Sequence, residues 1–417
     1  MGLAAAYHAA KAGHSVVLLE AGPEPGGMAA HFNFDGLSIE RFYHFVCKAD
    51  TAAFALLNEL GLGDRIRWRT TSMGFFIDGR LYEWGNPLAL FKFPVIGLLS
   101  RLRYGLLAFI STRRERWEAI ETQSAREWII RWCGAEVYER LWKPLFDLKF
   151  HEYADNVSAA WMWTRIRRIG RSRRSLLKEE LGYIEGGSQT LVDALCAAIR
   201  SYGGNIRVST PAVRILSDNE RVTGIQTSEE IVVAEAVIST MPVQLISSAA
   251  PDLPKAWKAK YDSINNIGVC CLIFKLKRSV TPHFWVNICE PDIEIPGLIE
   301  FSNLRPTSDR IIFVPYYMPA THPKFSWPSE KLLEEAFSYI QRLNPAIKRA
   351  DIIATHVSRL RYAQSIYEPG FAAKLPPIQT PIKGLQIADT CFYYPEDRCI
   401  SESVRIGREM AQRLATA

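Results

Sequence analysis

Residues 1–27 read MGLAAAYHAAKAGHSVVLLEAGPEPGG, and this stretch decides the fold. Small and apolar side chains recur at helical spacing as far as Gly13, so the sequence predicts a helix over residues 1–13. The β-branched and apolar run SVVLL at 15–19 predicts a short buried strand. Glu20 ends that strand, and a loop rich in glycine and proline follows. The order is therefore helix, strand, terminal acid and glycine loop.

This order is that of the second half of a dinucleotide-binding βαβ unit. In such a unit the acid that ends the second strand accepts hydrogen bonds from ribose hydroxyls, a role that falls to Glu20. Gly2 takes the place of the third glycine of the G-x-G-x-x-G turn, where the helix packs closely on the sheet. The first strand and the two pyrophosphate glycines would precede Met1, so we expect roughly ten further residues upstream. The alternative interpretation is an Ala-rich surface helix followed by a strand.

The loop after the strand carries a first resemblance. Glu20 and the pair Gly26-Gly27 have the spacing E-x5-G-G. This resembles the continuation found in flavoproteins of the amine oxidase, protoporphyrinogen oxidase and phytoene desaturase superfamily. Paired glycines let the backbone approach a pyrophosphate or a ribityl chain without interference from a Cβ atom. The resemblance implies that Gly26 and Gly27 help to bind FAD.

The C-terminal segment resembles the flavin motif of the same superfamily. Residues 384–389, GLQIAD, predict a strand that closes on Asp389, and a helical apolar pattern begins at Ile400. The resemblance implies that Asp389 binds the ribityl hydroxyls. It also implies that the helix N-terminus at Ile400 directs its positive end at the flavin. Ala388 stands where the superfamily usually has glycine, and the alternative role for Asp389 is a turn residue after a strand.

Three shorter blocks are similar to the same superfamily. Residues 183–196 resemble a glycine turn entering a helix. Residues 206–216 resemble a strand whose backbone near Ala212-Val213 lies by the adenine, and 236–242 a strand leading toward the substrate domain. The fold class that follows is α/β, with a discontinuous Rossmann-like FAD-binding domain that lacks its first strand and an α+β substrate domain with a mixed or antiparallel sheet. The expected boundaries are 1–75, 183–250 and 375–417 for FAD binding, and 76–182 and 251–374 for substrate.

Composition narrows the class of protein. The chain has 417 residues, 48% of them hydrophobic and 23% charged, which excludes a disordered chain and a small disulfide scaffold. Its net charge of +6 is a mild excess, and we expect no nucleic-acid partner. The eight cysteines form no C-x-x-C pair and no zinc-type cluster, so no metal site is expected. The chain opens without a secretory signal pattern, so we expect a cytoplasmic protein with reduced thiols.

Two stretches of the expected substrate domain leave alternatives open. Residues 88–110, LALFKFPVIGLLSRLRYGLLAFI, form the most apolar stretch, but its charges and its proline argue against a spanning helix. The stretch fits either a buried pair of helices or, as an amphipathic segment over 88–116, a peripheral contact with the inner membrane surface. Residues 165–174, RIRRIGRSRR, fit either a solvated helix face or a grip on a diphosphate-bearing substrate.

Candidates for the reacting side of the site lie in IERFYHFVCKAD, residues 39–50. In the superfamily this segment passes near the flavin ring, so the resemblance makes Arg41, Tyr43 and His44 candidates for lining the active site. A packed, hydrogen-bonded histidine is the alternative for His44. Amine oxidases of the superfamily usually carry a lysine near the strand that begins here at residues 265–271, NNIGVCC, which contain none.

The resemblance therefore implies an FAD-dependent oxidoreductase that dehydrogenates a hydrophobic or ring-containing small-molecule substrate through flavin N5. A second hypothesis is an isomerase resembling UDP-galactopyranose mutase, which uses reduced flavin on a sugar nucleotide. In that case the arginines of 165–174 would hold the diphosphate. A third hypothesis is a remnant of the fold without cofactor, because the glycine turn is missing from the start of the chain.

Overall fold

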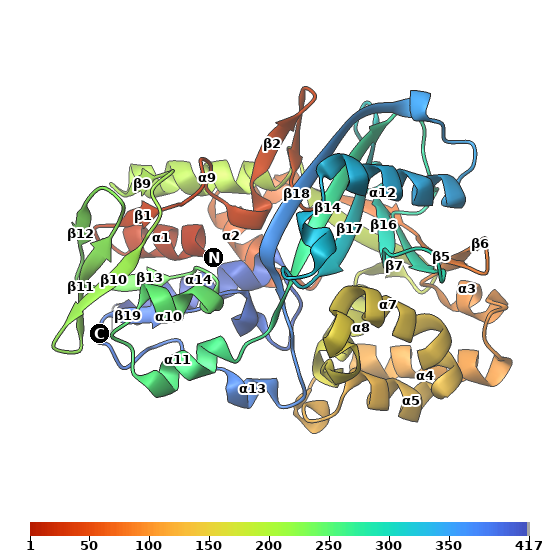
Figure 1. Ribbon diagram of the computed structural model, residues 1–417, viewed down its shortest axis with the longest axis horizontal. Helices are drawn as coiled ribbons and strands as arrows, with labels where there is room; N and C mark the ends of the chain where they lie inside the picture. The colour runs from red at the N-terminus through yellow and green to blue at the C-terminus, as the bar shows by residue number, and fades with distance from the viewer. Residues whose placement is uncertain (415–417) are drawn as a thin grey trace.

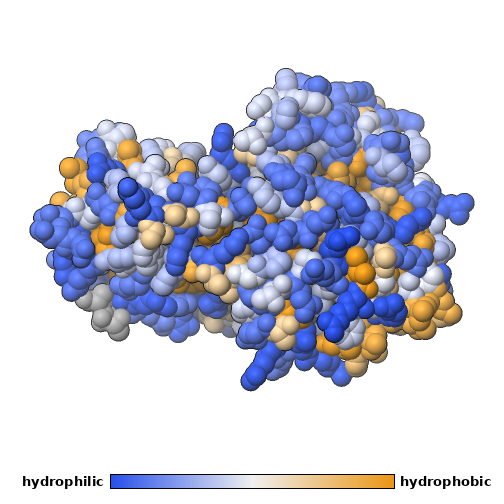
Figure 2. All heavy atoms as spheres, turned by 60° about the horizontal axis from the view of Figure 1, so that its bottom comes forward, coloured by the Kyte–Doolittle hydropathy of each residue, from blue (hydrophilic) through white to orange (hydrophobic). Residues whose placement is uncertain are grey.

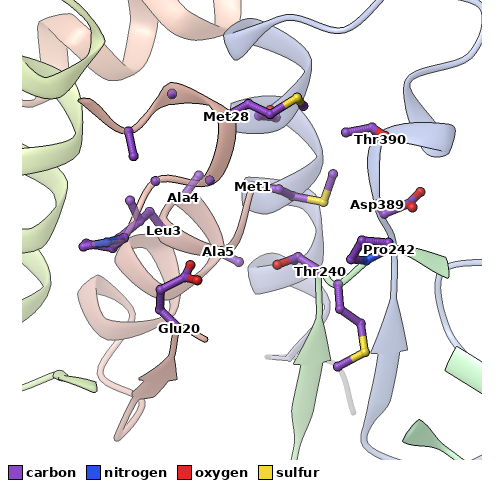
Figure 3. Close-up of a pocket in the computed structure, with 18 of the residues that line it drawn as sticks. Met1, Leu3, Ala4, Ala5, Glu20, Met28, Thr240, Pro242, Asp389 and Thr390 are labelled. Carbon is purple, nitrogen blue, oxygen red and sulfur yellow. The ribbon is translucent and has the colours of Figure 1, made fainter. Parts of the chain in front are cut away.

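The computed structural model describes residues 1–414 (Figure 1). Four short strands form two parallel pairs, and each pair joins segments far apart in the sequence. β1 (Val17–Leu19) pairs with β9 (Asn205–Arg207), and β13 (Val237–Ser239) pairs with β19 (Leu385–Ile387). Figure 3 shows β1, β13 and β19 running in the same direction, so their carboxyl ends meet at one edge. Open α/β folds bind their ligands at this edge.

Four helices lie beside these strands: α1 (Gly2–Lys11), α2 (Thr51–Glu59), α9 (Ser188–Ser201) and α14 (Ile400–Leu414). The predicted N-terminal helix and strand are thus confirmed, each slightly shorter than expected. The alanines of α1 are buried, and their small side chains let α14 pack against this helix. A Cβ atom on Gly407 of α14 would lie only 2.6 Å from the Met1 carbonyl oxygen, so this contact requires glycine. The expectation of further residues before Met1 stays a prediction.

The block at 206–216 forms two strands where the sequence suggested one. β9 ends at Arg207, and β10 (Arg214–Asp218) begins a separate antiparallel sheet with β11 (Arg221–Gln226) and β12 (Ile231–Val233). Ser209 adopts a φ of 52°, and Pro211 has no backbone N–H to donate to a ladder. The backbone between the two strands therefore cannot continue either sheet.

A seven-stranded mixed sheet forms the second large part of the molecule (Figure 1). Its order is β18-β14-β17-β16-β15-β5-β6, and within the described residues of this sheet the β15–β5 pairing is parallel and the others are antiparallel. The strands are β5 (Met73–Ile77), β6 (Arg80–Trp84), β14 (Asn266–Leu276), β15 (Trp285–Cys289), β16 (Gly297–Glu300), β17 (Arg310–Met318) and β18 (Ile352–Ser365). The expected α/β class with a mixed sheet is confirmed. The domain boundaries stay a prediction.

The central strand β14 is buried along nearly its whole length because both faces of the sheet are covered. Cys270 and Leu272 belong to a core shared with α12 (Ser329–Leu343), whereas Cys271 and Ile273 belong to the larger core on the other face. Successive residues of a strand point to opposite faces, so a sheet covered twice needs a continuous apolar run.

Smaller elements complete the fold. The hairpin of β2 (His31–Phe34) and β3 (Leu37–Glu40) follows the glycine loop, and β4 (Ile66–Thr71), β7 (Arg173–Ser175) and β8 (Lys178–Ile184) form a three-stranded sheet. The remaining short helices are α10 (Ile246–Ala249), α11 (Lys255–Asp262) and α13 (Phe371–Lys374). All eight cysteines are free thiols.

Residues 87–171 are mostly helical. The helices are α3 (Pro87–Lys92), α4 (Leu98–Arg113), α5 (Ala125–Cys133), α6 (Ala135–Val137), α7 (Lys143–Phe150) and α8 (Ala159–Arg171). The idea that 88–110 forms a pair of fully buried helices is wrong. Phe93 and Leu107 are buried, but many of the leucines of α3 and α4 face outward. Among residues 1–414, no helix has both the length and the apolar character that crossing a bilayer requires.

Candidate cofactor and substrate site

One cavity of about 1760 Å³ begins at the carboxyl ends of the parallel strands and continues to the seven-stranded sheet. Figure 3 shows its first part, with Glu20 and Asp389 on opposite sides of Met1. Thr240 and Pro242, which follow β13, lie between them in this view. Trp285 of β15 and Tyr317 of β17 line the other part. The cavity therefore joins a nucleotide-type edge to an aromatic chamber.

Glu20 lies directly after β1 and lines the cavity. Its Oε1 atom accepts a hydrogen bond from the Gly22 backbone N–H at 2.8 Å, which fixes the carboxylate over the loop. No other hydrogen bond to this carboxylate arises within residues 1–414, so Oε2 is available to a ligand. A half-buried carboxylate with an open acceptor fits a pair of ribose hydroxyls, as the sequence predicted.

Gly26 and Gly27 also line the cavity, and the loop needs glycine at the first of them. Gly26 has a φ of 117°, which side chains disfavour, and a Cβ there would lie 3.0 Å from Val192 Cγ2. Nothing lies within 4 Å of a Cβ built on Gly27, where φ is 59°. The backbone of this loop therefore faces the cavity bare, as a cradle for a phosphate or ribityl group would. Gly2 lines the same part of the cavity.

Asp389 and Ile400 come from the C-terminal segment and both line the cavity. Asp389 Oδ1 accepts from Cys391 N–H at 2.7 Å, and Oδ2 accepts from Val243 N–H at 2.9 Å. Burial raises the pKa of Asp389, and these hydrogen bonds oppose the increase. The carboxylate therefore ties the end of β19 to the loop after β13. Its predicted contact with a ribityl chain stays a prediction.

One predicted residue lies outside the cavity lining. Val213 is more than half exposed and donates its N–H to Gln226 O at 2.8 Å, whereas its neighbour Ala212 lines the cavity. The approach to an adenine at this point would therefore run through Ala212. Ala212 precedes β10, in the segment where the expected single strand is interrupted.

Arg41, Tyr43 and His44 all line the cavity, as the sequence predicted for the reacting side. The Tyr43 ring packs edge-on against Trp285 at 5.5 Å, and its Oη atom lies 3.5 Å from Tyr317 Oη. His44 Nδ1 is buried and has no hydrogen-bond partner within the described part of the chain. Burial lowers the pKa of His44, which favours the neutral form of its ring.

Sequence reasoning missed the charged group on the opposite wall. Lys149 of α7 lines the cavity, with its Nζ 5.0 Å from the centre of the Trp161 ring and 5.3 Å from that of Tyr317. Burial lowers the pKa of Lys149 well below its ordinary value, and the charge of Arg165 lowers it further. Lys149 lies in a helix between aromatic residues, and no motif marks it. Only the packing of α7 against β17 brings it to the cavity.

Asp397 is the acid of this group. It pairs with Arg165 and accepts a hydrogen bond from Trp161 Nε1 at 3.3 Å. Burial opposes its ionisation, but the charges of Arg165 and Lys149 outweigh burial and hold the pKa of Asp397 well below its usual range. Arg398 is also at the cavity, and its Nε–H is buried without a partner in the described chain. The chamber thus carries more basic than acidic side chains.

Of the two alternatives for residues 165–174, the structure does not favour a diphosphate grip. Arg165 and Arg168 line the cavity, but Arg165 pairs with Asp397, and Arg168 makes two bonds to Asp50 at 3.1 and 2.8 Å. Arg171 instead bonds the Thr112 carbonyl in the last turn of α4, and Arg173 bonds the Gly85 carbonyl before α3. Successive arginines of a helix point in different directions, so a run of them in sequence does not converge on one anion. Lys275 of β14 is also outside the cavity, paired with Asp35 at 2.9 Å.

Comparison with known proteins places the chain in a family. A model described as flavin containing amine oxidoreductase matches residues 2–414, and the chain belongs to that family. It is 25% identical over 291 residues to 15-cis-phytoene desaturase from Synechococcus elongatus, covering 62% of this chain and 58% of the relative. It is 26% identical over 286 residues to 15-cis-phytoene desaturase from Arabidopsis thaliana, and this match covers 62% of this chain and 48% of the relative. The chain spans about half the length of these curated relatives.

Solved structures agree on the fold. Putrescine oxidase bound to putrescine gives a TM-score of 0.73 at 17% identity, covering 100% of this chain and 96% of that one. Cyclohexylamine oxidase from Brevibacterium oxydans gives a TM-score of 0.72 at 15% identity, covering 99% of this chain and 96% of that one. At these identities the likeness shows the fold alone. The family is one of flavin-containing proteins, and the acid, the glycine cradle and the unpaired Glu20 oxygen of this chain fit such a cofactor.

Proposed function

We propose that this protein dehydrogenates an uncharged hydrophobic or ring-containing substrate, with FAD as the hydride acceptor. When bound, FAD supplies the redox chemistry at its N5 atom. Glu20, the Gly26-Gly27 loop and the N-terminus of α14 at Ile400 would hold the cofactor. The substrate would occupy the chamber between Tyr43 and Lys149. The observation that carries this proposal is the composition of that chamber.

The chamber combines apolar surface with a surplus of positive charge. Aromatic rings line it, among them Tyr43, Trp285 and Tyr317. Its basic and acidic side chains are Arg41, Lys149, Arg165, Arg168 and Arg398 against Glu396 and Asp397. Burial lowers the pKa of Lys149, because desolvation disfavours a cation at this place. A protonated amine would meet the same penalty, whereas a neutral hydrocarbon or ring would gain from the aromatic wall.

The chain's own residues have separate roles in this proposal. Tyr43, Trp285 and Tyr317 orient the substrate by ring contacts and exclude water. Arg165 and Asp397 neutralise one another at the chamber wall, so that neither charge opposes an apolar ligand. His44, whose burial favours the neutral ring, lies next to Tyr43 in the cavity lining and adds no charge to it. Lys149, whose pKa burial lowers well below its ordinary value, can accept a proton released during dehydrogenation.

The experiment compares substrates on the purified holoenzyme. Under anaerobic conditions the flavin absorbance is followed after adding phytoene in detergent, putrescine or cyclohexylamine, the substrates named for the relatives. We expect bleaching with the neutral polyene or a comparable ring compound and no more than trace bleaching with either amine. Rapid bleaching by putrescine would contradict the proposal, and failure of the protein to bind FAD would refute the cofactor assignment.

The two alternative functions are not favoured. A sugar-nucleotide isomerase needs a site for a diphosphate, and the arginines of 165–174 do not form one. A remnant without cofactor is disfavoured because the family match extends over residues 2–414 and the cavity retains an acid and a glycine cradle. A purified sample that is colourless after incubation with FAD would restore the remnant hypothesis.

A further inference from the structure

Helices α3 and α4 expose an apolar face to solvent. Seven leucine and phenylalanine side chains on them are each 50–69% exposed. They are Leu88, Phe91, Leu98, Leu99, Leu102, Leu106 and Phe109, and we call them the α3–α4 face. Figure 2 shows apolar atoms gathered at the corner that these helices form, with strongly hydrophilic side chains beside them. Contiguous apolar patches of this kind on a folded protein mark interaction surfaces.

The solvent-facing side of α4 carries apolar residues at the spacing that is typical of a buried helix face. Leu98, Leu102, Leu106 and Phe109 recur at intervals of four, four and three residues, which places them on one face of the helix. The opposite face is already occupied, because Leu107 is buried and α4 packs against α5 and α8. Both faces of α4 are apolar, but the core of the protein buries only one of them. The outer stripe therefore lacks a partner within residues 1–414.

The face is held in a fixed arrangement. The Arg101 guanidinium on α4 donates to Phe91 O at 2.7 Å and to Ile96 O at 2.8 Å, which ties α4 to the end of α3. Glu136 accepts from Gly97 N–H at 3.0 Å at the start of α4. Neighbouring leucines extend the apolar surface, because Leu176 is exposed at the tip of the β7–β8 hairpin, and Arg173 in that hairpin bonds Gly85 O just before α3.

Basic side chains surround this face with few acids among them. Residues 87–116 contain six lysines and arginines and a single acid, Glu115, and residues 171–178 contain four basic residues and no acid. Lys92 and Arg113 are exposed beside the leucines, and the Arg113 guanidinium lies 4.3 Å from the centre of the Phe109 ring. Leucines flanked by arginines fit a partner that has an apolar layer beneath anionic groups.

We infer that the α3–α4 face docks the protein peripherally on an anionic phospholipid bilayer. Leu102, Leu106 and Phe109 enter the boundary of the acyl chains, and Lys92 and Arg113 pair with phosphate groups. A second copy of this chain is a poorer occupant. A symmetric contact would place one basic rim against another, and like charges across an interface oppose association. The inference rests on the surface alone and is independent of the proposed substrate.

Flotation of the holoenzyme with vesicles tests this inference. Vesicles of phosphatidylcholine with about one third phosphatidylglycerol are compared with vesicles of phosphatidylcholine alone. The double variant Leu102→Glu, Leu106→Glu changes the centre of the face, and Ile231→Glu on β12 is the matched control, since Ile231 is 58% exposed far from this face. All three of these side chains lie at the surface, and thermal unfolding checks that each variant is folded.

The native protein should float with the anionic vesicles, less strongly with neutral vesicles and less strongly at high salt. The double variant should lower the membrane partition coefficient by about tenfold or more, and Ile231→Glu should leave it unchanged. Equal binding of the native protein and the double variant would overturn the inference. If the native protein binds neither kind of vesicle, the inference is also overturned. This holds whether or not the protein forms a dimer that the double variant dissociates. Substrate specificity would be unaffected by either result.

Discussion

Asp389 ties together the two strand ends that border the cofactor side of the cavity, so Asp389→Ala should weaken the fold as well as the binding of FAD. The carboxylate is 6% exposed and accepts from two backbone N–H groups, those of Cys391 and Val243. Val243 follows β13, and Asp389 follows β19. Replacement by alanine removes both acceptors and leaves two donors in a buried place.

The magnitude follows from these two bonds. A buried donor left without an acceptor costs about 1–3 kcal/mol, so two of them should lower the free energy of unfolding by about 2–6 kcal/mol. Asp389→Asn retains one acceptor oxygen and should lose about half as much. Because the damage lies in the protein itself, it should appear in the absence of FAD as well as in its presence.

Denaturant unfolding of the apoprotein and FAD titration of the same samples together measure the two effects. Asp218→Ala is the control, since Asp218 is an exposed strand-end aspartate and should change the free energy of unfolding by less than about 0.5 kcal/mol. If apo Asp389→Ala unfolds like the native apoprotein and only FAD affinity falls, the reasoning is refuted. Asp389 would then act by contacting the cofactor, as the sequence resemblance implies.

Three further predictions rest on single side chains. Glu20→Gln should weaken FAD binding about tenfold or more by isothermal titration, because a charged acceptor for ribose is lost; equal affinity would disprove the role. Burial raises the pKa of Glu179 from 4.5 to about 7, so native stability should fall as pH rises through that interval. Glu179→Gln should therefore gain up to about 3 kcal/mol above pH 7 and little near pH 4.5, and a pH-independent difference would contradict this assignment. Lys149→Met should remove a transition below pH 10.5 from the rate of flavin reduction, and an unchanged profile would exclude proton transfer by Lys149.

The cofactor side of the site could be predicted because its signals are local. A strand ending in Glu20, a loop with Gly26-Gly27 and a strand ending in Asp389 each depend on backbone conformation over a few residues. Such conformations are encoded by β-branched runs, glycines and acids at fixed positions. Val213 shows the limit of this reasoning, because a left-handed Ser209 and Pro211 interrupt the expected strand and leave Ala212 at the cavity.

The α/β class and the order of helix, strand, acid and glycine loop could be inferred from spacing along the chain, whereas the candidates Arg41, Tyr43 and His44 came from the resemblance to the flavoprotein superfamily. Only the tertiary structure decided which charges meet at the substrate chamber and which leucines remain outside. Lys149 and Asp397 are separated by more than two hundred residues, and packing of α7 against the seven-stranded sheet brings both to one cavity. An apolar stripe has the same pattern whether it faces a core or a membrane, so only packing shows which side of α4 is left uncovered.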